Sequence, residues 1–141
     1  MESWKIQAIA SAFFAGITAV VAKFGLENIS ADLGLAIRTA FVFGFVLVNV
    51  FVWRDHAGLG QLTARQIGFL AASAGTTAAS WIYYYRAMKD GPLSMVALID
   101  KGSVVVTLLL SFLLLREPLT PRLVSGATLI LAGILVLTVK R

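Results

Sequence analysis

The stretch LGLAIRTAFVFGFVLVNVFVW, residues 33–53, decides the fold class, because within it only Arg38 carries a charge. A helix of about 20 apolar residues is what the roughly 30 Å hydrocarbon layer of a bilayer requires. Lipid offers the backbone no hydrogen-bond partners, so a spanning segment must be a helix or part of a closed barrel, and this stretch lacks the alternation of a barrel strand. We therefore expect it to be a transmembrane helix.

The composition of the whole chain agrees with this stretch. Its 141 residues are 59% hydrophobic and 13% charged, against about 45–50% and 25% in soluble domains. A chain of this length has too little interior to hide so much apolar surface from water, so it is expected to be an integral membrane protein. The net charge of +5 fits basic side chains at helix ends beside anionic headgroups and predicts no nucleic acid partner.

Five such apolar segments lie between polar breaks and form a single domain, residues 1–141. Thr63 and Gln66 have the spacing of a capping box at a helix start. Pro92 and Pro121 suit the first turns of the last two segments. The predicted fold is all-α, and its five transmembrane helices cover about residues 4–24, 33–53, 64–85, 92–115 and 120–139.

The charges leave the orientation in the membrane open. An odd number of spans puts the two termini on opposite sides, and the lysines and arginines at the span ends and in the breaks divide equally between those sides. One side holds Lys5, Arg54, Arg65, Arg116 and Arg122, and the other holds Lys23, Arg86, Lys89, Lys140 and Arg141. The tie predicts either dual topology or a fixed orientation with a weak signal. Two oppositely oriented copies would form a ten-helix antiparallel homodimer, an inverted repeat of the kind common in secondary transporters.

Three ionisable residues fall inside the expected spans, where each costs about 2.5 to 3.5 kcal/mol to insert. Arg38 and Lys101 have long side chains that can reach the membrane surface, whereas the side chain of Asp100 is too short to do so. Asp100 must therefore be paired, protonated or in contact with water. Arg38 and Asp100 enter from the same side at depths that differ by about 5 Å, so an ion pair between them is possible.

Polar side chains at helical spacing accompany these charges. Asp100, Ser103, Thr107 and Ser111 form a stripe on the fourth span, and Ser73, Thr76, Thr77, Ser80 and Tyr84 form one on the third. Such stripes indicate either a hydrated cavity or hydroxyls bonded to carbonyls of their own or neighbouring helices. Gly126 and Gly133 mark a seam of small residues on the last span, for a dimer interface or for packing within one chain.

Three segments stand out by their order along the chain: Tyr84–Met88 after the third span, Ile99–Val105 within the fourth, and the Leu115–Thr120 ending before the last. In this order they resemble an EamA-type repeat of the drug/metabolite transporter superfamily. Larger members of that superfamily look like two five-span repeats fused in inverted orientation, so the resemblance implies a single half that works as a dimer. Arg116 stands where the family often has glycine. The first span has no glutamate of the kind that four-span multidrug exporters use for cationic drugs.

The sequence thus predicts a secondary transporter, not an enzyme, that moves a small zwitterionic or anionic metabolite by alternating access in a bacterial or archaeal cytoplasmic (inner) membrane. Exchange of a proton or counter-ion at Asp100 would make it an antiporter. No cofactor, metal ligand set or catalytic group is expected. The predicted substrate-binding and coupling residues are Arg38, Asp100, Lys101, Ser103, Trp81 and Tyr84.

Two other classes remain open from the residues. The chain could be a non-transporting subunit of a larger membrane complex, in which case protein would fill the polar stripes, or its partner could be a paralogue rather than a second copy. An intramembrane enzyme fits least well, because only Asp100 could act as an acid or base.

Overall fold

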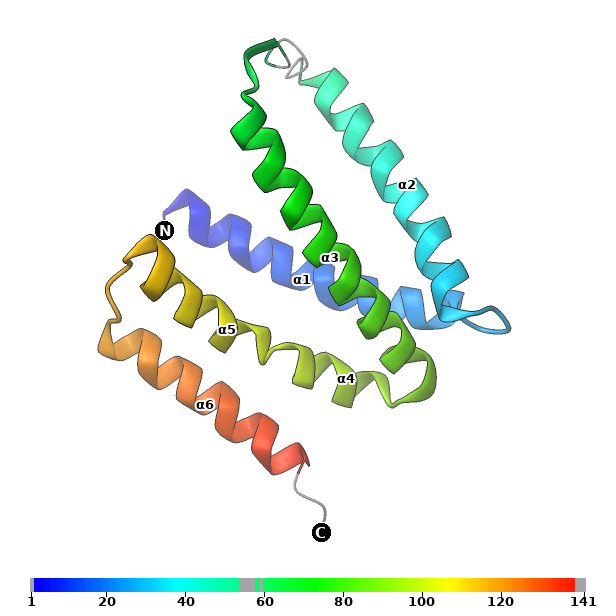
Figure 1. Cartoon of the computed structure of the whole chain (residues 1–141). Helices are drawn as coiled ribbons and strands as arrows, with labels where there is room; N and C mark the ends of the chain where they lie inside the picture. Colours follow the sequence, from blue (N-terminus) through cyan, green and yellow to red (C-terminus); the bar gives the residue numbers. More distant parts are fainter. Residues whose placement is uncertain (1, 54–57, 59, 139–141) are drawn as a thin grey trace. The chain divides into compact units, whose positions relative to one another are not determined.

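The computed structural model describes residues 2–53, 58 and 60–138, and it is helical in each of the five predicted spans (Figure 1). Arg54, Lys140, Arg141 and the predicted end of the last span at residue 139 lie outside the described residues. The chain divides into two compact units, Met1–Asp90 and Gly91–Arg141. The first contains α1 (Ser3–Gly25), α2 (Ala31–Val52) and α3 (Ala64–Asp90), and the second contains α4 (Leu93–Asp100), α5 (Ser103–Leu110), the π-helix η2 (Ser111–Leu115) and α6 (Pro121–Thr138).

The helix starts are set by local side-chain chemistry. The predicted capping box of α3 is confirmed: the backbone N–H of Gln66 donates to Thr63 Oγ1 at 3.3 Å, and the backbone N–H of Thr63 donates to Gln66 Oε1 at 2.8 Å. Ser30 caps α2 by accepting from the backbone N–H of Leu33 at 3.2 Å. Thr120 does the same for α6, where Pro121 occupies the first helical position. These caps satisfy N–H groups that have no partner within their own helix.

In the first unit, the end of α1, the start of α2 and the end of α3 meet in a small core. Leu26, Leu35, Tyr85 and Met88 are the buried hydrophobic residues, and Met88 is fully enclosed. Two lysines tie the helix ends together: Lys23 Nζ donates to the carbonyl of Met88, and Lys89 Nζ donates to the carbonyl of Leu26 at 2.6 Å. Cations at helix C-termini complement the helix dipole, so this reciprocal arrangement stabilises both ends.

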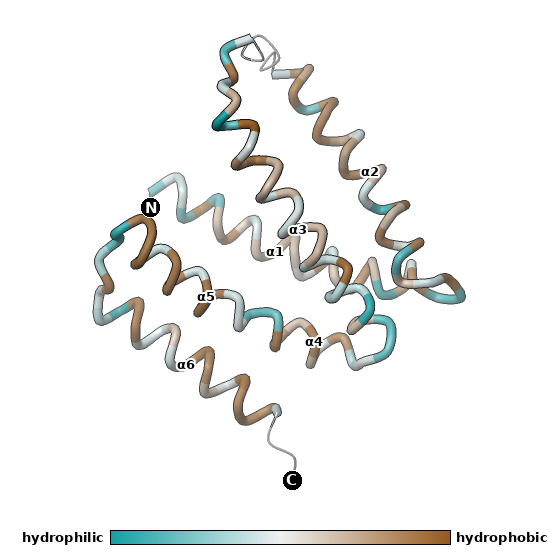
Figure 2. Tube along the Cα trace, viewed as in Figure 1, coloured by the Kyte–Doolittle hydropathy of each residue, from teal (hydrophilic) through white to brown (hydrophobic). Residues whose placement is uncertain are grey.

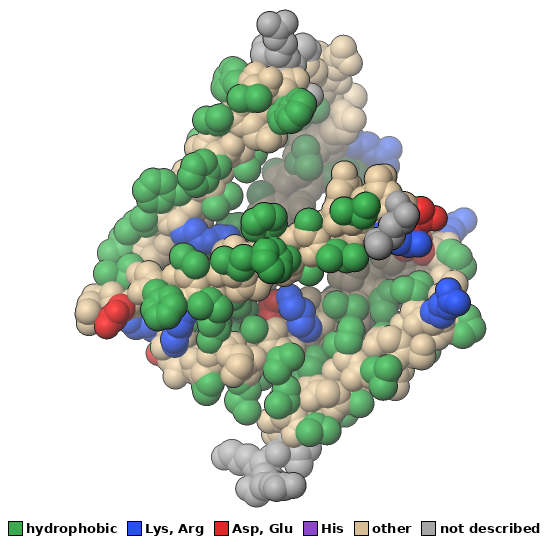
Figure 3. Space-filling view, turned by 180° about the vertical axis from the view of Figure 1, so that it is seen from behind, with side chains coloured by type: hydrophobic (Ala, Val, Ile, Leu, Met, Phe, Trp, Pro, Cys, Tyr) green, Lys and Arg blue, Asp and Glu red, His purple; other side chains and the backbone are tan. Residues whose placement is uncertain are grey.

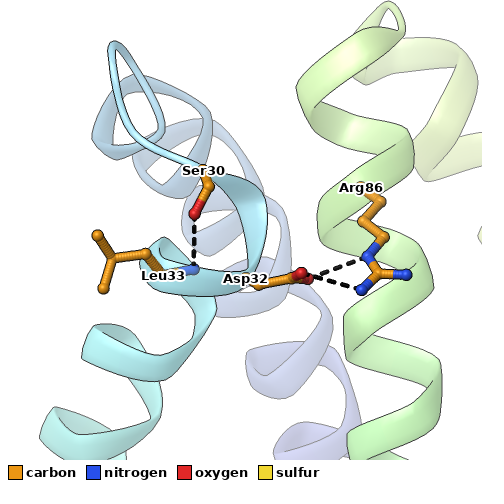
Figure 4. A network of polar contacts seen from close by, with 4 residues as sticks. All are labelled: Ser30, Asp32, Leu33 and Arg86. Atoms are coloured by element: carbon orange, nitrogen blue, oxygen red, sulfur yellow. Dashed lines mark hydrogen bonds and ion pairs between the residues drawn. The ribbon is translucent and has the colours of Figure 1, made fainter.

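An ion pair fixes the level of α2 against α3. Arg86 donates from Nε and Nη2 to the two carboxylate oxygens of Asp32, at 3.0 and 2.9 Å (Figure 4). Such a two-point contact defines orientation as well as distance. Because Asp32 lies at the start of α2 and Arg86 near the end of α3, the two helices, which contact each other, run antiparallel.

The predicted fourth span is divided into α4, α5 and η2. The turn between α4 and α5 falls at Lys101 and Gly102, directly after Asp100. The backbone N–H groups of Lys101 and Gly102 bond the carbonyls three residues before them, at 3.1 and 2.9 Å, which is the 3₁₀ pattern. The tube in Figure 2 turns hydrophilic at this junction, between two apolar helices.

At the end of η2, Arg116 adopts a left-handed backbone with φ of 56°. This conformation usually selects glycine, because a Cβ atom crowds the following carbonyl. Arg116, where the resembled family often has glycine, is therefore the left-handed residue at which the chain reverses direction.

Apolar side chains lie exposed along the helices, including Phe45 at 72% and Val136 at 77% of full exposure (Figure 3). Among the described residues, four helical segments are long and apolar enough to cross a membrane: α1, α2, the stretch Leu93–Leu115, and α6. The protein is therefore a multi-pass membrane protein. The remaining helix, α3, would span about 40 Å at 1.5 Å per residue, but it is less apolar than its neighbours (Figure 2). The count of five spans stays a prediction.

Candidate functional site

Arg38 lies on α2 with its guanidinium over an aromatic ring of α3. Its Cζ atom is 4.5 Å from the centre of the Trp81 ring, which is within the range of a cation–π contact. Because α2 and α3 run antiparallel, the first turns of α2 lie beside the last turns of α3. Two predicted site residues, Arg38 and Trp81, therefore meet. No carboxylate of the first unit forms an ion pair with Arg38 among the described residues. The Arg38 charge is held in place by Trp81 without being neutralised there.

Tyr85 is a feature that sequence reasoning missed. The predicted site residue Tyr84 is half-buried, and its ring centre lies 6.5 Å from that of Tyr85. Tyr85 itself is only 5% exposed, and its hydroxyl has no hydrogen-bond partner among the described residues. The signal was helical spacing, because Trp81, Tyr85 and Met88 follow one another at intervals of four and three residues and so share one face of α3.

Two grooves flank α2. The first, between α1 and α2, has a volume of about 660 Å³, and its lining includes Thr18, Arg38 and Tyr85. The second, between α2 and α3, has a volume of about 530 Å³ and reaches Thr77 and Trp81. Both linings are otherwise largely apolar.

The hydroxyls along these helices bond mostly to their own backbone. Thr39 Oγ1 donates to the carbonyl of Leu35 at 2.8 Å, and Thr76 and Thr77 both donate to the carbonyl of Ser73 at 2.9 Å. Such bonds satisfy the hydroxyl locally and leave little for a ligand. This favours the interpretation of the α3 stripe as internally bonded side chains.

In the second unit, Asp100 and Lys101 stand at the turn between α4 and α5. Lys101 Nζ lies 3.8 Å from Asp100 Oδ2, and both side chains are partly exposed. Ser103 begins α5, and its carbonyl accepts a hydrogen bond from Thr107 Oγ1 at 3.0 Å. The structure thus places Asp100, Lys101 and Ser103 at one turn, and in the first unit it brings Arg38 into contact with Trp81, while Tyr84 lies three residues further along α3. The predicted proximity of Arg38 to Asp100 joins the two units and stays a prediction.

The glycine seam of α6 is open. An added Cβ at Gly126 or Gly133 would meet no atom within 4 Å. Gly133 lines a groove of about 290 Å³ that also includes Lys101 and residues of α5. Among the described residues, no cluster of histidine, aspartate or glutamate could hold a metal ion.

The known family of EamA-like transporters matches residues 2–139, over helices arranged as described above. The chain belongs to this family. Members of the EamA-like transporter family are transporters rather than enzymes, so this chain is a transporter in a lipid bilayer with a small-molecule substrate.

Two relatives of this EamA-like transporter come from bacteria. The first, from Sinorhizobium sp., is called an uncharacterized transporter in the cobO 3' region; it is 36% identical over 138 residues, 98% of either chain. The second, from Pseudomonas savastanoi pv. phaseolicola, is called a probable 4-amino-4-deoxy-L-arabinose-phosphoundecaprenol flippase subunit ArnF. It is 31% identical over 91 residues, 63% of this chain and 66% of the relative. No solved structure matches the chain significantly.

Proposed function

We propose that this protein is a secondary transporter that moves a small anionic or zwitterionic metabolite by alternating access as a dimer in a bacterial cytoplasmic membrane. The observation that carries this proposal is a 3₁₀ turn at Lys101 and Gly102, directly after Asp100, within the apolar helical segment Leu93–Leu115. A short 3₁₀ stretch inside a helix often marks a functional hinge, and many transporters bind substrate and coupling ion where a membrane helix departs from regular geometry. Ionisable residues at that depth are costly to insert and are therefore candidates for function.

The charges support an anionic or zwitterionic substrate. Asp100 and Lys101 lie close enough to offset each other, whereas Arg38 keeps its charge over the Trp81 ring. The sum for the three ionised side chains is +1 per chain. In this proposal Arg38, Asp100 and Lys101 select the charge of the solute, and Asp100 exchanges a proton or counter-ion. The remaining predicted site residues, Trp81, Tyr84 and Ser103, line the path.

Five spans and an antiparallel homodimer complete the proposal. Because α3 packs antiparallel along α2, which is itself apolar enough to span, α3 would cross the membrane beside it. Ten helices from two copies could enclose a path that five cannot, and the open seam at Gly126 and Gly133 is available for an interface.

Dual topology has a direct test. Two reporters are fused in turn after Arg141, one active only inside the cell and the other only outside it, and both should give activity if the equal charge distribution inserts the chain both ways. Adding two lysines beside Arg122 should bias the distribution toward one side. Activity confined to one face in the unaltered chain would contradict dual topology and leave a parallel or heteromeric dimer.

Binding of the substrate class is tested by ligand-induced thermal stabilisation of the purified protein. Panels of anionic, zwitterionic and cationic metabolites are compared, because a ligand that binds only the folded state raises its stability. Stabilisation by anionic or zwitterionic compounds should be lost in Arg38→Ala and Asp100→Asn. The control is Arg65→Ala, which removes another arginine that lies over an aromatic ring, Phe69. Stabilisation by cations alone, or equal loss in the control, would contradict the proposal.

A second candidate is a subunit that transports only with a different partner chain. The relative named as a flippase subunit supports this alternative. It predicts that the purified chain binds substrate weakly and moves none, whereas addition of a paralogue restores transport. Transport by the purified chain alone would contradict it.

A further inference from the structure

The groove between α1 and α2 has a volume of about 660 Å³ and an apolar lining that also includes Arg38 and Tyr85. Among the described residues, no carboxylate of the first unit pairs with Arg38, and the hydroxyl of Tyr85 has no hydrogen-bond partner. The lining runs along α2 from Gly34 to Phe45, about 16 Å at 1.5 Å per residue. That length is close to half of the roughly 30 Å hydrocarbon layer. The groove therefore matches the depth of one leaflet of a bilayer.

The first polar group is the guanidinium of Arg38. It lines the groove from α2 and is positioned by Trp81, and no carboxylate of the first unit pairs with it among the described residues. An aromatic ring contacts one face of a guanidinium and leaves its N–H donors available. Those donors match phosphate and carboxylate oxygens in number and geometry.

The second polar group is the hydroxyl of Tyr85, a residue of α3 that lines the groove. This side chain is 95% buried, being 5% exposed, and the hydroxyl finds no hydrogen-bond partner among the described residues. Arg38 and Tyr85 belong to the lining of the same groove. A buried hydroxyl without a partner is destabilising, and an acceptor placed at this point would remove the penalty.

We propose that this groove binds an anionic amphiphile, with its phosphate or carboxylate head on Arg38 and Tyr85 and its apolar tail between α1 and α2. The proposal rests on the transport function proposed above and narrows its substrate to a polar anionic head that carries an apolar chain. Charge complementarity selects the head, because Arg38 lines the groove and no described carboxylate of the first unit forms an ion pair with it. The apolar lining over one leaflet's depth selects the tail.

The test measures binding of dodecyl phosphate to the purified full-length chain in an uncharged detergent, by calorimetric titration against protein-free micelles. Saturable binding of one molecule per chain is expected, with inorganic phosphate, dodecanol and dodecyltrimethylammonium each binding much more weakly. Arg38→Gln should weaken binding at least about tenfold, because it removes a charged donor. Arg65→Gln, which removes an arginine outside the groove, should leave binding unchanged.

Tyr85→Phe separates a ligand contact from a structural role. It should weaken binding of dodecyl phosphate about threefold to tenfold, while the ligand-free protein becomes no less stable, because the hydroxyl it removes has no partner. A variant that loses binding and folded stability together would overturn the assignment of Tyr85. Equal affinity for dodecyl phosphate in Arg38→Gln and Arg65→Gln would overturn the site, because binding would not involve Arg38. No saturable binding to the unaltered chain would also overturn it and would indicate that protein covers the groove.

Reconstituted vesicles distinguish this proposal from the transport function on which it rests. Movement of dodecyl phosphate between leaflets, accelerated by the protein and lost in Arg38→Gln, supports the narrowed substrate class. Binding without movement would make the occupant a resident membrane lipid and overturn the substrate assignment. If small anions are transported in the same vesicles while dodecyl phosphate neither binds nor moves, the transport function stands and the amphiphile proposal fails.

Discussion

Gly34→Ala is the most sharply defined perturbation of the first unit. A Cβ atom built at Gly34 would lie 2.3 Å from Leu26 Cδ2 and 3.3 Å from Ile29 Cδ1. Carbon atoms in contact are about 3.5 to 4.0 Å apart, so Leu26 would have to move by more than about 1 Å. Leu26 is only 2% exposed, so its side chain has little room for that movement.

The expected magnitude follows from two opposing terms. Overpacking of a filled site costs about 1 to 3 kcal/mol, and replacing glycine by alanine within a helix returns about 0.5 to 1 kcal/mol. The free energy of unfolding should therefore fall by about 1 to 2 kcal/mol. Gly44→Ala on the same helix is the matched control, because an added Cβ there meets nothing within 4 Å. It should be neutral or stabilising.

Reversible unfolding in mixed micelles, followed by circular dichroism, compares the two variants. The informative quantity is the difference between them, since both gain the same helix propensity. Equal changes in the free energy of unfolding for Gly34→Ala and Gly44→Ala would refute the contact of α2 with the end of α1. A decrease in the free energy of unfolding for Gly44→Ala alone would instead indicate that another chain packs closely against α2 at that residue.

Three further substitutions, two of them paired with a control, probe other parts of the fold through the same unfolding measurement. Arg116→Gly should raise the free energy of unfolding by about 1 kcal/mol, because it relieves a left-handed residue, whereas Asn28→Gly, at φ of 60°, should change it little because asparagine tolerates this conformation. Met88→Ala should cost about 2 to 5 kcal/mol at its fully buried site, and Met95→Ala, at 40% exposure, should cost less. Thr63→Ala should cost about 0.5 to 2 kcal/mol through loss of the cap.

Each of these three expectations has an opposite result that would contradict it. A destabilised Arg116→Gly would mean that the arginine side chain contributes more than its backbone strain costs. Similar losses for Met88→Ala and Met95→Ala would contradict the location of the core. A neutral Thr63→Ala would mean that water satisfies the start of α3 equally well.

The parts of the fold that could be predicted are those governed by local chemistry and by the bilayer. Long apolar runs predicted helices where the structure has them, and the spacing of Thr63 and Gln66 predicted a cap that forms. The division of the fourth span was not predicted, because Lys101 and Gly102 are compatible with a helix, and the turn depends on backbone bonds that hydropathy does not report.

The candidate site was predicted only as far as residue type allowed. Ionisable residues in apolar segments identified Arg38, Asp100 and Lys101, but residue type alone did not predict that the Trp81 ring would lie against the guanidinium of Arg38. Tyr85 was missed as a site residue because what distinguishes it is a buried hydroxyl without a hydrogen-bond partner among the described residues. That property depends on the packing between three helices. Contacts of this kind arise from the level at which antiparallel helices pair, and the Asp32–Arg86 ion pair helps to set that level.

Transport by the purified chain tests the central claim most directly. The protein is reconstituted alone into liposomes, and counterflow of anionic, zwitterionic and cationic solutes is measured for the unaltered chain, Arg38→Gln, Asp100→Asn and Arg65→Gln. We expect saturable uptake of an anionic or zwitterionic solute that is retained in Arg65→Gln and lost in Arg38→Gln, and whose pH dependence is lost in Asp100→Asn. Folded, inserted protein that moves none of these solutes, or that moves them equally well without Arg38, would contradict it.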